Sequence, residues 1–266
     1  MIKIVLIILI ILIIIYYIKY KNYNYIEKFK KIYYSNKLID NIKKPYIVNN
    51  FLNDFSNWDF DFFKKNYGNT NIFIVKSNNK KCIMIDYEII KTTLNEYIEN
   101  YIYKKTSNNY YFRSDDAYQF LSDIGLDKII LNSFNKHLPF YLFRQISFWM
   151  GPINSYTTFH YDTDHSNLLC LLEGSKLIYI VNPEYHIENC KTIEMNYYST
   201  FDMFDREKIN SLIKEKKILK IILKKGQILN IPRYIWHAVI NLENSIAFTL
   251  HYYNLDSFLF NNVLRL

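Results

Sequence analysis

Thr157-Thr158-Phe159-His160-Tyr161-Asp162 is the segment from which most of the chemistry of this chain can be inferred. On a β-strand, residues two apart project from the same face, so we expect His160 and Asp162 to point one way and Tyr161 the other. An imidazole and a carboxylate on one face, joined by an imidazole from another strand, form the two-histidine, one-carboxylate site of non-haem iron(II). Three ligands on one face leave positions open for further molecules.

A second segment strengthens this interpretation, because a lone His-x-Asp pair is common by chance. Residues 226–237 read Gly-Gln-Ile-Leu-Asn-Ile-Pro-Arg-Tyr-Ile-Trp-His, which is a turn glycine, a strand, a proline, and Trp-His at the start of another strand. Together the two segments resemble the JmjC and cupin-like family of Fe(II)- and 2-oxoglutarate-dependent oxygenases, particularly its hydroxylase branch. The resemblance implies that His160, Asp162 and His237 are the metal ligands and the catalytic centre.

The resemblance also implies a binding site for 2-oxoglutarate as co-substrate. Thr157 lies three residues before the first ligand, Asn167 lies seven after it, and Lys176 follows at the start of the next strand. By the family pattern, Lys176 pairs with the distal carboxylate in a charge-assisted contact, with Thr157 as its helper and Asn167 nearby. Tyr111 is the tyrosine expected to hydrogen-bond that carboxylate, although Tyr110 is one register away.

The activity implied is hydroxylation of a protein side chain with release of succinate and CO2. Two alternatives stay open, namely a JmjC-type lysine demethylase and a catalytically silent, membrane-tethered cupin that serves as a binding module. His251 stands where hydroxylase relatives often carry a small polar residue, and its role is left open. The substrate is not encoded in any recognisable motif.

Composition supports a folded chain and excludes several classes of site. The 266 residues are 50% hydrophobic and 18% aromatic, so the chain can bury a large core. No two of its five glycines lie closer than 23 residues, which excludes a dinucleotide-binding glycine loop, a Walker A loop and a Gly-x-Ser-x-Gly nucleophile elbow. The three widely spaced cysteines exclude a full disulfide framework and a Cys-x-x-Cys pair.

The net charge of +8 does not by itself indicate nucleic-acid binding. The chain is rich in Ile, Lys, Asn and Tyr, which are residues with AT-rich codons, and it has no arginine-rich stripe or recognition-helix motif. Nucleic acid is therefore not an expected partner. A protein or peptide substrate is what the family resemblance implies.

The N-terminus predicts a membrane anchor. Ile4 to Ile18 are all apolar or tyrosine, with Lys3 before them and Lys19 and Lys21 after them. As a helix these fifteen residues span about 22 Å, which is short of a hydrocarbon core of about 30 Å unless flanking residues extend it. With no small-residue cleavage site, we expect an uncleaved transmembrane helix. The lysines after it place the catalytic domain in the cytoplasm of a single-pass membrane protein.

Hydrophobic patterning predicts the remaining organisation. We expect a transmembrane anchor at 1–21, a linker helix at 22–43, one JmjC/cupin-like oxygenase domain at 44–254 and a tail at 255–266. In the first half of the domain, 44–48 and 71–76 are expected strands, and 53–65 and 87–103 expected helices. Eight strands are expected beyond Leu142, at 143–150, 157–162, 167–172, 176–181, 218–223, 227–231, 237–241 and 246–253. The fold expected is mainly β with some α. It is a double-stranded β-helix, or jelly-roll barrel, with a mixed helical N-terminal part and an N-terminal transmembrane helix.

Overall fold

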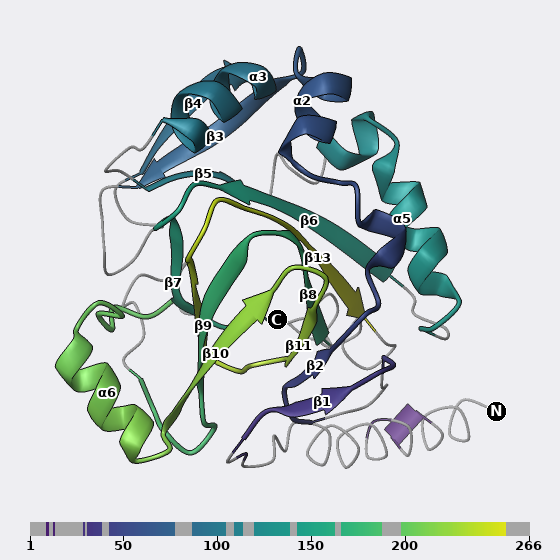
Figure 1. The fold of residues 1–266 in the computed structure, drawn as a ribbon. Helices are drawn as coiled ribbons and strands as arrows, with labels where there is room; N and C mark the ends of the chain where they lie inside the picture. Colours follow the sequence, from purple (N-terminus) through teal and green to yellow (C-terminus); the bar gives the residue numbers. More distant parts are fainter. Residues whose placement is uncertain are drawn as a thin grey trace.

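Two facing β-sheets form the centre of the molecule (Figure 1). The computed structural model describes residues 9–10, 13, 29, 31–38, 43–77, 87–104, 109–113, 120–138, 143–162, 166–187 and 198–253. The larger sheet has the strand order β1-β2-β11-β8-β13-β6-β5-β3-β4, and the smaller has the order β10-β9-β12-β7. Four strands of the larger sheet, β11-β8-β13-β6, face the four of the smaller one, as in a jelly roll.

The strands of the second half are those that the hydrophobic patterning predicts, within two residues at each end. They are β6 (Phe143–Gly151), β7 (Tyr156–His160), β8 (Ser166–Glu173), β9 (Ser175–Val181), β10 (Ile218–Lys224), β11 (Ile228–Pro232), β12 (His237–Asn241) and β13 (Ser245–Tyr253). The larger sheet is extended by β1 (Tyr33–Ser35), β2 (Tyr46–Val48), β3 (Asn71–Ser77), β4 (Tyr87–Thr93) and β5 (Asn109–Arg113). The pairing of β1 with β2 is parallel, and the other strand pairs in the described chain are antiparallel.

Alternation along each strand divides the core into three layers. On β8, Leu168 and Cys170 face outward to the helices, whereas Leu169 and Leu171 face the space between the sheets. On β9, Leu177 and its neighbours two apart face outward on the opposite side. Because both faces of β8 and β9 are covered, these two strands are apolar on both sides, apart from a few polar side chains that point inward.

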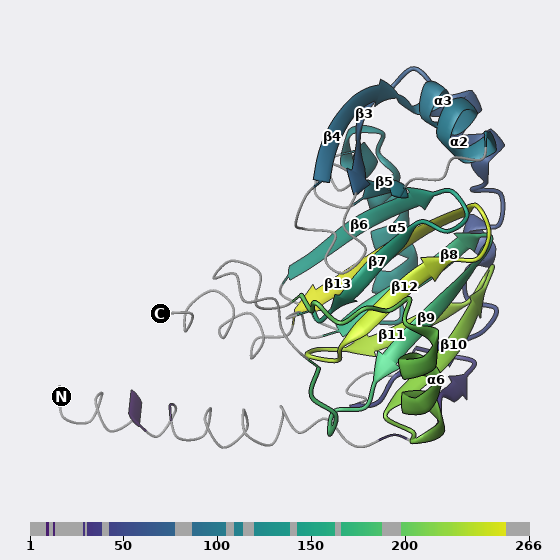
Figure 2. The same ribbon diagram turned by 90° about the vertical axis from the view of Figure 1, so that its left-hand side faces the viewer.

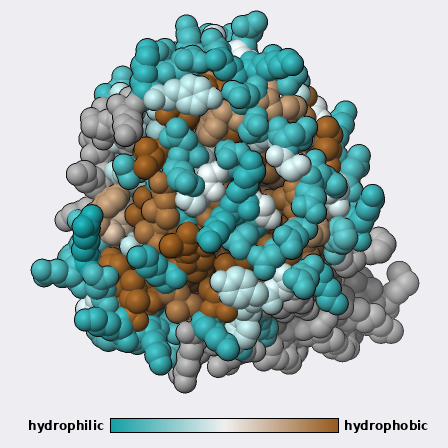
Figure 3. All heavy atoms as spheres, viewed as in Figure 1, coloured by the Kyte–Doolittle hydropathy of each residue, from teal (hydrophilic) through white to brown (hydrophobic). Residues whose placement is uncertain are grey.

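Helices cover the outer faces of both sheets (Figure 2). They are η1 (Asn53–Phe55), α2 (Phe60–Tyr67), α3 (Leu94–Tyr97), the π-helical turn η2 (Ile98–Tyr103), α5 (Leu126–Asn135) and α6 (Arg206–Lys214). The first five lie over the larger sheet and α6 lies beside the smaller one. On the face shown in Figure 3, hydrophobic residues gather mainly toward the lower left, where β9 and β10 lie in Figure 1, with hydrophilic residues between them.

Two helix predictions in the first half of the domain are corrected. The helix expected at 53–65 is split into η1 and α2, because the Asp59 side chain accepts the Phe62 N–H and starts a new helix there. The helix expected at 87–103 begins as strand β4. Thr93 then forms a capping box with Glu96, so the helix starts only at residue 94. Pairing of β4 with β3 outweighs the amphipathic pattern of its sequence.

The predictions for the N-terminal residues are also corrected. Most of 1–21 lies outside the described residues. Within this range the structure describes only Leu9, Ile10 and Ile13, which are helical and exposed. No helix in the described part of the chain is long and apolar enough to span a bilayer. A span needs about 20 apolar residues, and the run in this sequence is shorter. The predicted transmembrane helix, and the single-pass membrane location drawn from it, are therefore wrong on this finding.

Part of the predicted linker helix is a strand instead. Within 22–43 the structure describes residues 29, 31–38 and 43, and Tyr33–Ser35 form β1 beside β2. None of the described residues in this range is helical, and the other residues of that prediction lie outside the described residues, as does the tail at 255–266.

Candidate metal centre and its pocket

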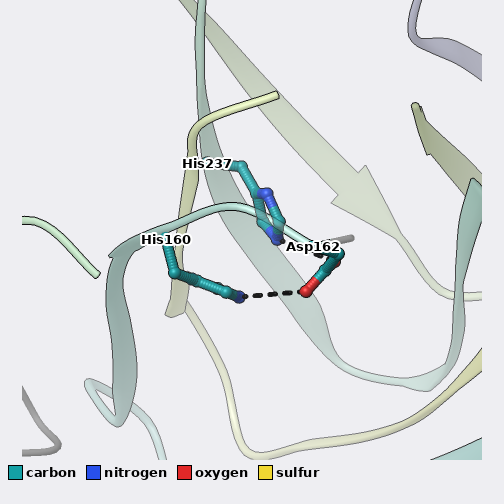
Figure 4. A group of neighbouring side chains, drawn as sticks. All are labelled: His160, Asp162 and His237. Carbon is teal, nitrogen blue, oxygen red and sulfur yellow. Dashed lines mark ion pairs between the residues drawn. The ribbon is translucent and has the colours of Figure 1, made fainter. Parts of the chain in front are cut away.

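Three side chains that can bind a metal converge where β7 and β12 pair. His160 ends β7, His237 begins β12, and the two residues face each other in the strand register. Asp162 follows two residues after His160. Figure 4 shows the three side chains pointing toward one another. The Asp162 carboxylate lies 3.7 Å from His237 Nε2 and 4.0 Å from His160 Nε2, and all three ligand atoms lie within 4.8 Å of one another.

These spacings suit a shared ion better than direct hydrogen bonds. At 3.7 and 4.0 Å, the nitrogen and oxygen atoms are beyond hydrogen-bonding distance. Two bonds of about 2.1 Å from a metal to such ligands can span at most about 4.2 Å, and both measured distances from the carboxylate to an imidazole lie within that limit. The group therefore has the chemistry and the spacing of a site for one metal ion.

Backbone contacts select the tautomer of both histidines. His160 Nδ1 lies 2.8 Å from the Thr158 carbonyl oxygen, and His237 Nδ1 lies 2.9 Å from the Ile235 carbonyl oxygen. A carbonyl oxygen only accepts, so each Nδ1 carries the hydrogen and each Nε2 keeps its lone pair toward Asp162. Metal-binding histidines are oriented in this way.

The carboxylate of Asp162 is held in its ionised form. Burial alone raises its pKa, but the positive charge that His237, His160 and His251 carry when protonated, together with the hydrogen bond from Asn167, brings the pKa below the ordinary value. Asn167 Nδ2 donates to Asp162 Oδ2 at 2.6 Å. Asn167 Oδ1 is buried and has no donor among the described residues, so it is an acceptor available to a molecule in the pocket.

A β-bulge in β7 brings a second polar side chain into the pocket. His237 pairs with His160, but Val239, two residues on, pairs with Thr157, which is three residues back. The extra residue on β7 turns Thr157 and His160 to the same side despite their odd spacing. Strict alternation would place them on opposite faces.

At the other end of the pocket lies a buried ammonium group. Lys176, on β9, is 1% exposed, and its Nζ donates to Asn241 Oδ1 at 2.6 Å and to Tyr111 Oη at 3.0 Å. Burial lowers the pKa of Lys176 to about 7. No carboxylate in the described part of the chain pairs with this group.

One pocket connects these two ends. His160, His237 and Asn167 line one end, and Lys176 and Tyr111 line the other. The walls between them are largely apolar and include Leu169, Ile231, Val239 and Trp149. The pocket is small and partly open to solvent. A molecule with two polar ends and an apolar middle matches this lining.

All seven residues singled out in the sequence lie in or beside this pocket. Asp162 is not on the strand as expected, since β7 ends at His160. Its position is instead maintained by a hydrogen bond from the Tyr234 N–H to the Asp162 carbonyl oxygen. Thr157 lines the pocket but makes no hydrogen bond to Lys176 among the described residues, and Asn167 contacts Asp162 directly. The structure also adds Asn241, which the sequence indicates only by its place four residues after His237.

Comparison with known proteins gives two matches. The model of the cupin-like domain family matches residues 35–258. JmjC domain-containing protein D of Dictyostelium discoideum is 31% identical over 107 residues, which cover 39% of this chain and 24% of that protein. The aligned region is thus about a quarter of the length of that relative.

Proposed function

Because this chain belongs to the cupin-like domain family, we propose that it is an Fe(II)- and 2-oxoglutarate-dependent oxygenase that hydroxylates a protein side chain. The observation that carries this proposal is the two-ended pocket. A cluster of three metal-binding side chains lies at one end, and a buried ammonium without a carboxylate partner among the described residues lies at the other.

The donor set fits ferrous iron. His160, His237 and Asp162 would hold the ion through two imidazole nitrogens and one carboxylate, which is the ligand set associated with non-haem iron(II) oxygenases. Each imidazole is oriented by a backbone carbonyl, and the carboxylate is oriented by Asn167. These contacts pre-organise the ligands, so little conformational entropy is lost when a metal binds.

The far end fits the distal carboxylate of 2-oxoglutarate. The Lys176 ammonium and the Tyr111 hydroxyl lie together at this end of the pocket. The carboxylate of a bound ligand would supply a negatively charged partner for the ammonium. The apolar walls face the methylene carbons of the co-substrate.

When bound, ferrous iron and 2-oxoglutarate supply the oxidising chemistry, in which one oxygen atom of O2 enters a substrate C–H bond and the other enters succinate, with release of CO2. The residues of this chain bind and orient the reactants. Lys176 and Tyr111 anchor the co-substrate, and the apolar walls limit the contact of the reactants with water. Tyr198 stacks on the ring of His160 at 5.4 Å between centroids and restrains that ligand.

A titration of the full-length protein tests the metal and co-substrate together. Under nitrogen, Fe(II) followed by 2-oxoglutarate is expected to produce a metal-to-ligand charge-transfer absorption band in the wild type. His160→Ala is expected to lose the band, because one of three ligands is removed. His186→Ala is the matched control, since His186 is exposed and lies outside the pocket. Absence of the band in the wild type, or its survival in His160→Ala, would overturn the proposal in favour of a silent binding module.

A protein substrate is tested separately. The wild type and His237→Ala are expressed in matched cells, and tryptic peptides are compared by mass spectrometry. We expect residues that gain about 16 Da, one oxygen atom, only with the wild type. Loss of N-methyl groups instead would identify demethylation as the reaction.

A further inference from the structure

The buried amide of Asn241 is the closest partner of the Lys176 ammonium. Asn241 is completely buried, and its Oδ1 accepts a hydrogen bond from Lys176 at 2.6 Å. Its Nδ2 lies 2.7 Å from Ser155 Oγ and 3.3 Å from the carbonyl oxygens of Gly151 and Pro152. Every polar atom of this side chain is therefore engaged.

The orientation of this amide follows from its neighbours. An ammonium group can only donate, so the oxygen of Asn241 must face Lys176. Ser155 Oγ donates to the Pro152 carbonyl at 2.7 Å and therefore accepts from Asn241 Nδ2. A flipped amide would place two donors against the ammonium, so the position of Oδ1 is well determined.

Asn241 is neutral, and that property matters for a ligand. An aspartate at this position would neutralise Lys176 within the protein, whereas an amide oxygen holds the ammonium in place and leaves its positive charge available. Asn241 thus holds the Lys176 ammonium in place without neutralising its charge.

Tyr111, the second partner of Lys176, packs closely on Gly151. A Cβ atom at Gly151 would lie 2.6 Å from the Tyr111 ring and 2.5 Å from Ser155 Oγ. Only glycine leaves space for both groups, so Tyr111 and Ser155 are held against the same point of the backbone. The amide, the hydroxyl groups and Lys176 form one packed cluster.

The register of the smaller sheet connects this cluster to the metal centre. Asn241 lies opposite Lys176 in the pairing of β12 with β9, and His237 lies four residues earlier on β12. Four residues of extended strand place the Cα atoms about 13 Å apart. The distance between the metal ligand and the site that holds the ammonium is therefore set by one strand.

We propose that Asn241 fixes the depth of the Lys176 ammonium in the pocket and thereby determines the chain length of the 2-oxo diacid that binds. Asn241 is a positioning and specificity-determining residue that acts through Lys176. This inference rests on the proposed function, since it takes 2-oxoglutarate as the ligand of the pocket.

Binding of three diacids to the full-length protein tests the proposal without turnover. Mn(II)-loaded protein is titrated by calorimetry under nitrogen with oxaloacetate, 2-oxoglutarate and 2-oxoadipate, which have four, five and six carbons. We expect the wild type to bind 2-oxoglutarate best. In Asn241→Ala the ammonium is no longer held, so affinity for 2-oxoglutarate should fall about tenfold, the typical loss for a hydrogen bond to a charged group. The ratio of the affinity for 2-oxoglutarate to the affinity for 2-oxoadipate should also become smaller than in the wild type.

Two further variants keep the test decisive if Asn241→Ala folds poorly. Asn241→Asp is almost isosteric and pairs with Lys176, so it should weaken 2-oxoglutarate binding more than alanine does. Ser155→Ala removes the group that orients the amide and should give a smaller loss of affinity and selectivity. Asn210→Ala, an exposed change on α6, is the matched control and should bind all three diacids like the wild type.

Failure of this inference can be distinguished from failure of the proposed function. If Lys176→Met binds 2-oxoglutarate as tightly as the wild type, the proposed co-substrate site is wrong. If Lys176→Met abolishes binding but the Asn241 variants keep wild-type affinity and selectivity, only the role of Asn241 is overturned. If Asn241→Asp and Ser155→Ala lose the same factor of affinity for all three diacids, the role of Asn241 in selectivity is also overturned, because that result indicates a merely structural role.

Discussion

Lys176 illustrates how a single residue can lower stability to provide a binding site. Burial lowers its pKa from 10.5 to about 7, and at about 1.4 kcal/mol per pKa unit this corresponds to roughly 5 kcal/mol. Unfolded chains keep this proton up to about pH 10.5, whereas the folded protein releases it near pH 7. The unfolded state therefore binds more protons between these values, and stability rises with pH across that window. Below pH 7 the full cost is present.

We therefore predict that Lys176→Met stabilises the ligand-free protein at low pH. At pH 6 the free energy of unfolding in urea should rise by about 2 to 4 kcal/mol, less than the full cost because two hydrogen bonds of the ammonium are lost. At pH 9 the gain should be smaller by about 3 kcal/mol, because the folded protein has released the proton above pH 7. Lys220→Met, an exposed change on β10, should show no such dependence. Equal gains at both pH values would contradict the buried-charge explanation.

At the scale of elements, the regular alternation of side chains between the two faces of a strand was predictable from the sequence. Local departures from this alternation were not. Leu168 and Leu169 fall on opposite faces of β8 as the pattern indicates. The bulge in β7 depends on pairing with β12, so no local pattern reveals that Thr157 and His160 share a face. Similarly, 87–103 has a helical pattern, but β4 is determined by its neighbour β3. Tertiary pairing outweighs local preference in both cases.

The start of α2 gives a prediction at this scale. Asp59→Ala removes the acceptor of the Phe62 N–H and should lower the free energy of unfolding by about 1 kcal/mol, as for other N-caps. Urea denaturation measures this change. Asp61→Ala, in the first turn but outside the cap, should cost less. A similar loss for both variants would indicate that charge near the helix end, and not the cap hydrogen bond, is responsible.

At the scale of the whole molecule, the pocket lies between the two sheets and is partly open to solvent. Helices pack on the outer faces of the sheets, and the polar side chains of the pocket face inward between them. Metal binding stays a prediction, but the convergence of His160, Asp162 and His237 could be predicted from their spacing and the family pattern. Asn241 could not, because only the register of β12 against β9 shows which residue meets Lys176.

Ligand binding should stabilise the whole molecule in two separable steps. At 100 times Kd a ligand adds about 2.7 kcal/mol, or roughly 5 to 10 °C in Tm for a protein of this size. We expect Mn(II) to raise Tm in the wild type and 2-oxoglutarate to raise it further, as measured by calorimetric scanning under nitrogen. Asp162→Ala should lose the first increase. Lys176→Met should keep the first and lose the second, and the opposite pattern would contradict the assigned ends of the pocket.

The path of β12 determines which changes of sequence this part of the protein can tolerate. Since His237 and Asn241 belong to the same five-residue strand, the proposed metal centre and the residue that holds Lys176 are separated by a fixed length of backbone and not by adjustable side-chain packing. The spacing between these two positions does not depend on the loops that connect the strands. Insertion or deletion of one residue within β12 would break it at once, because every following side chain would turn to the opposite face.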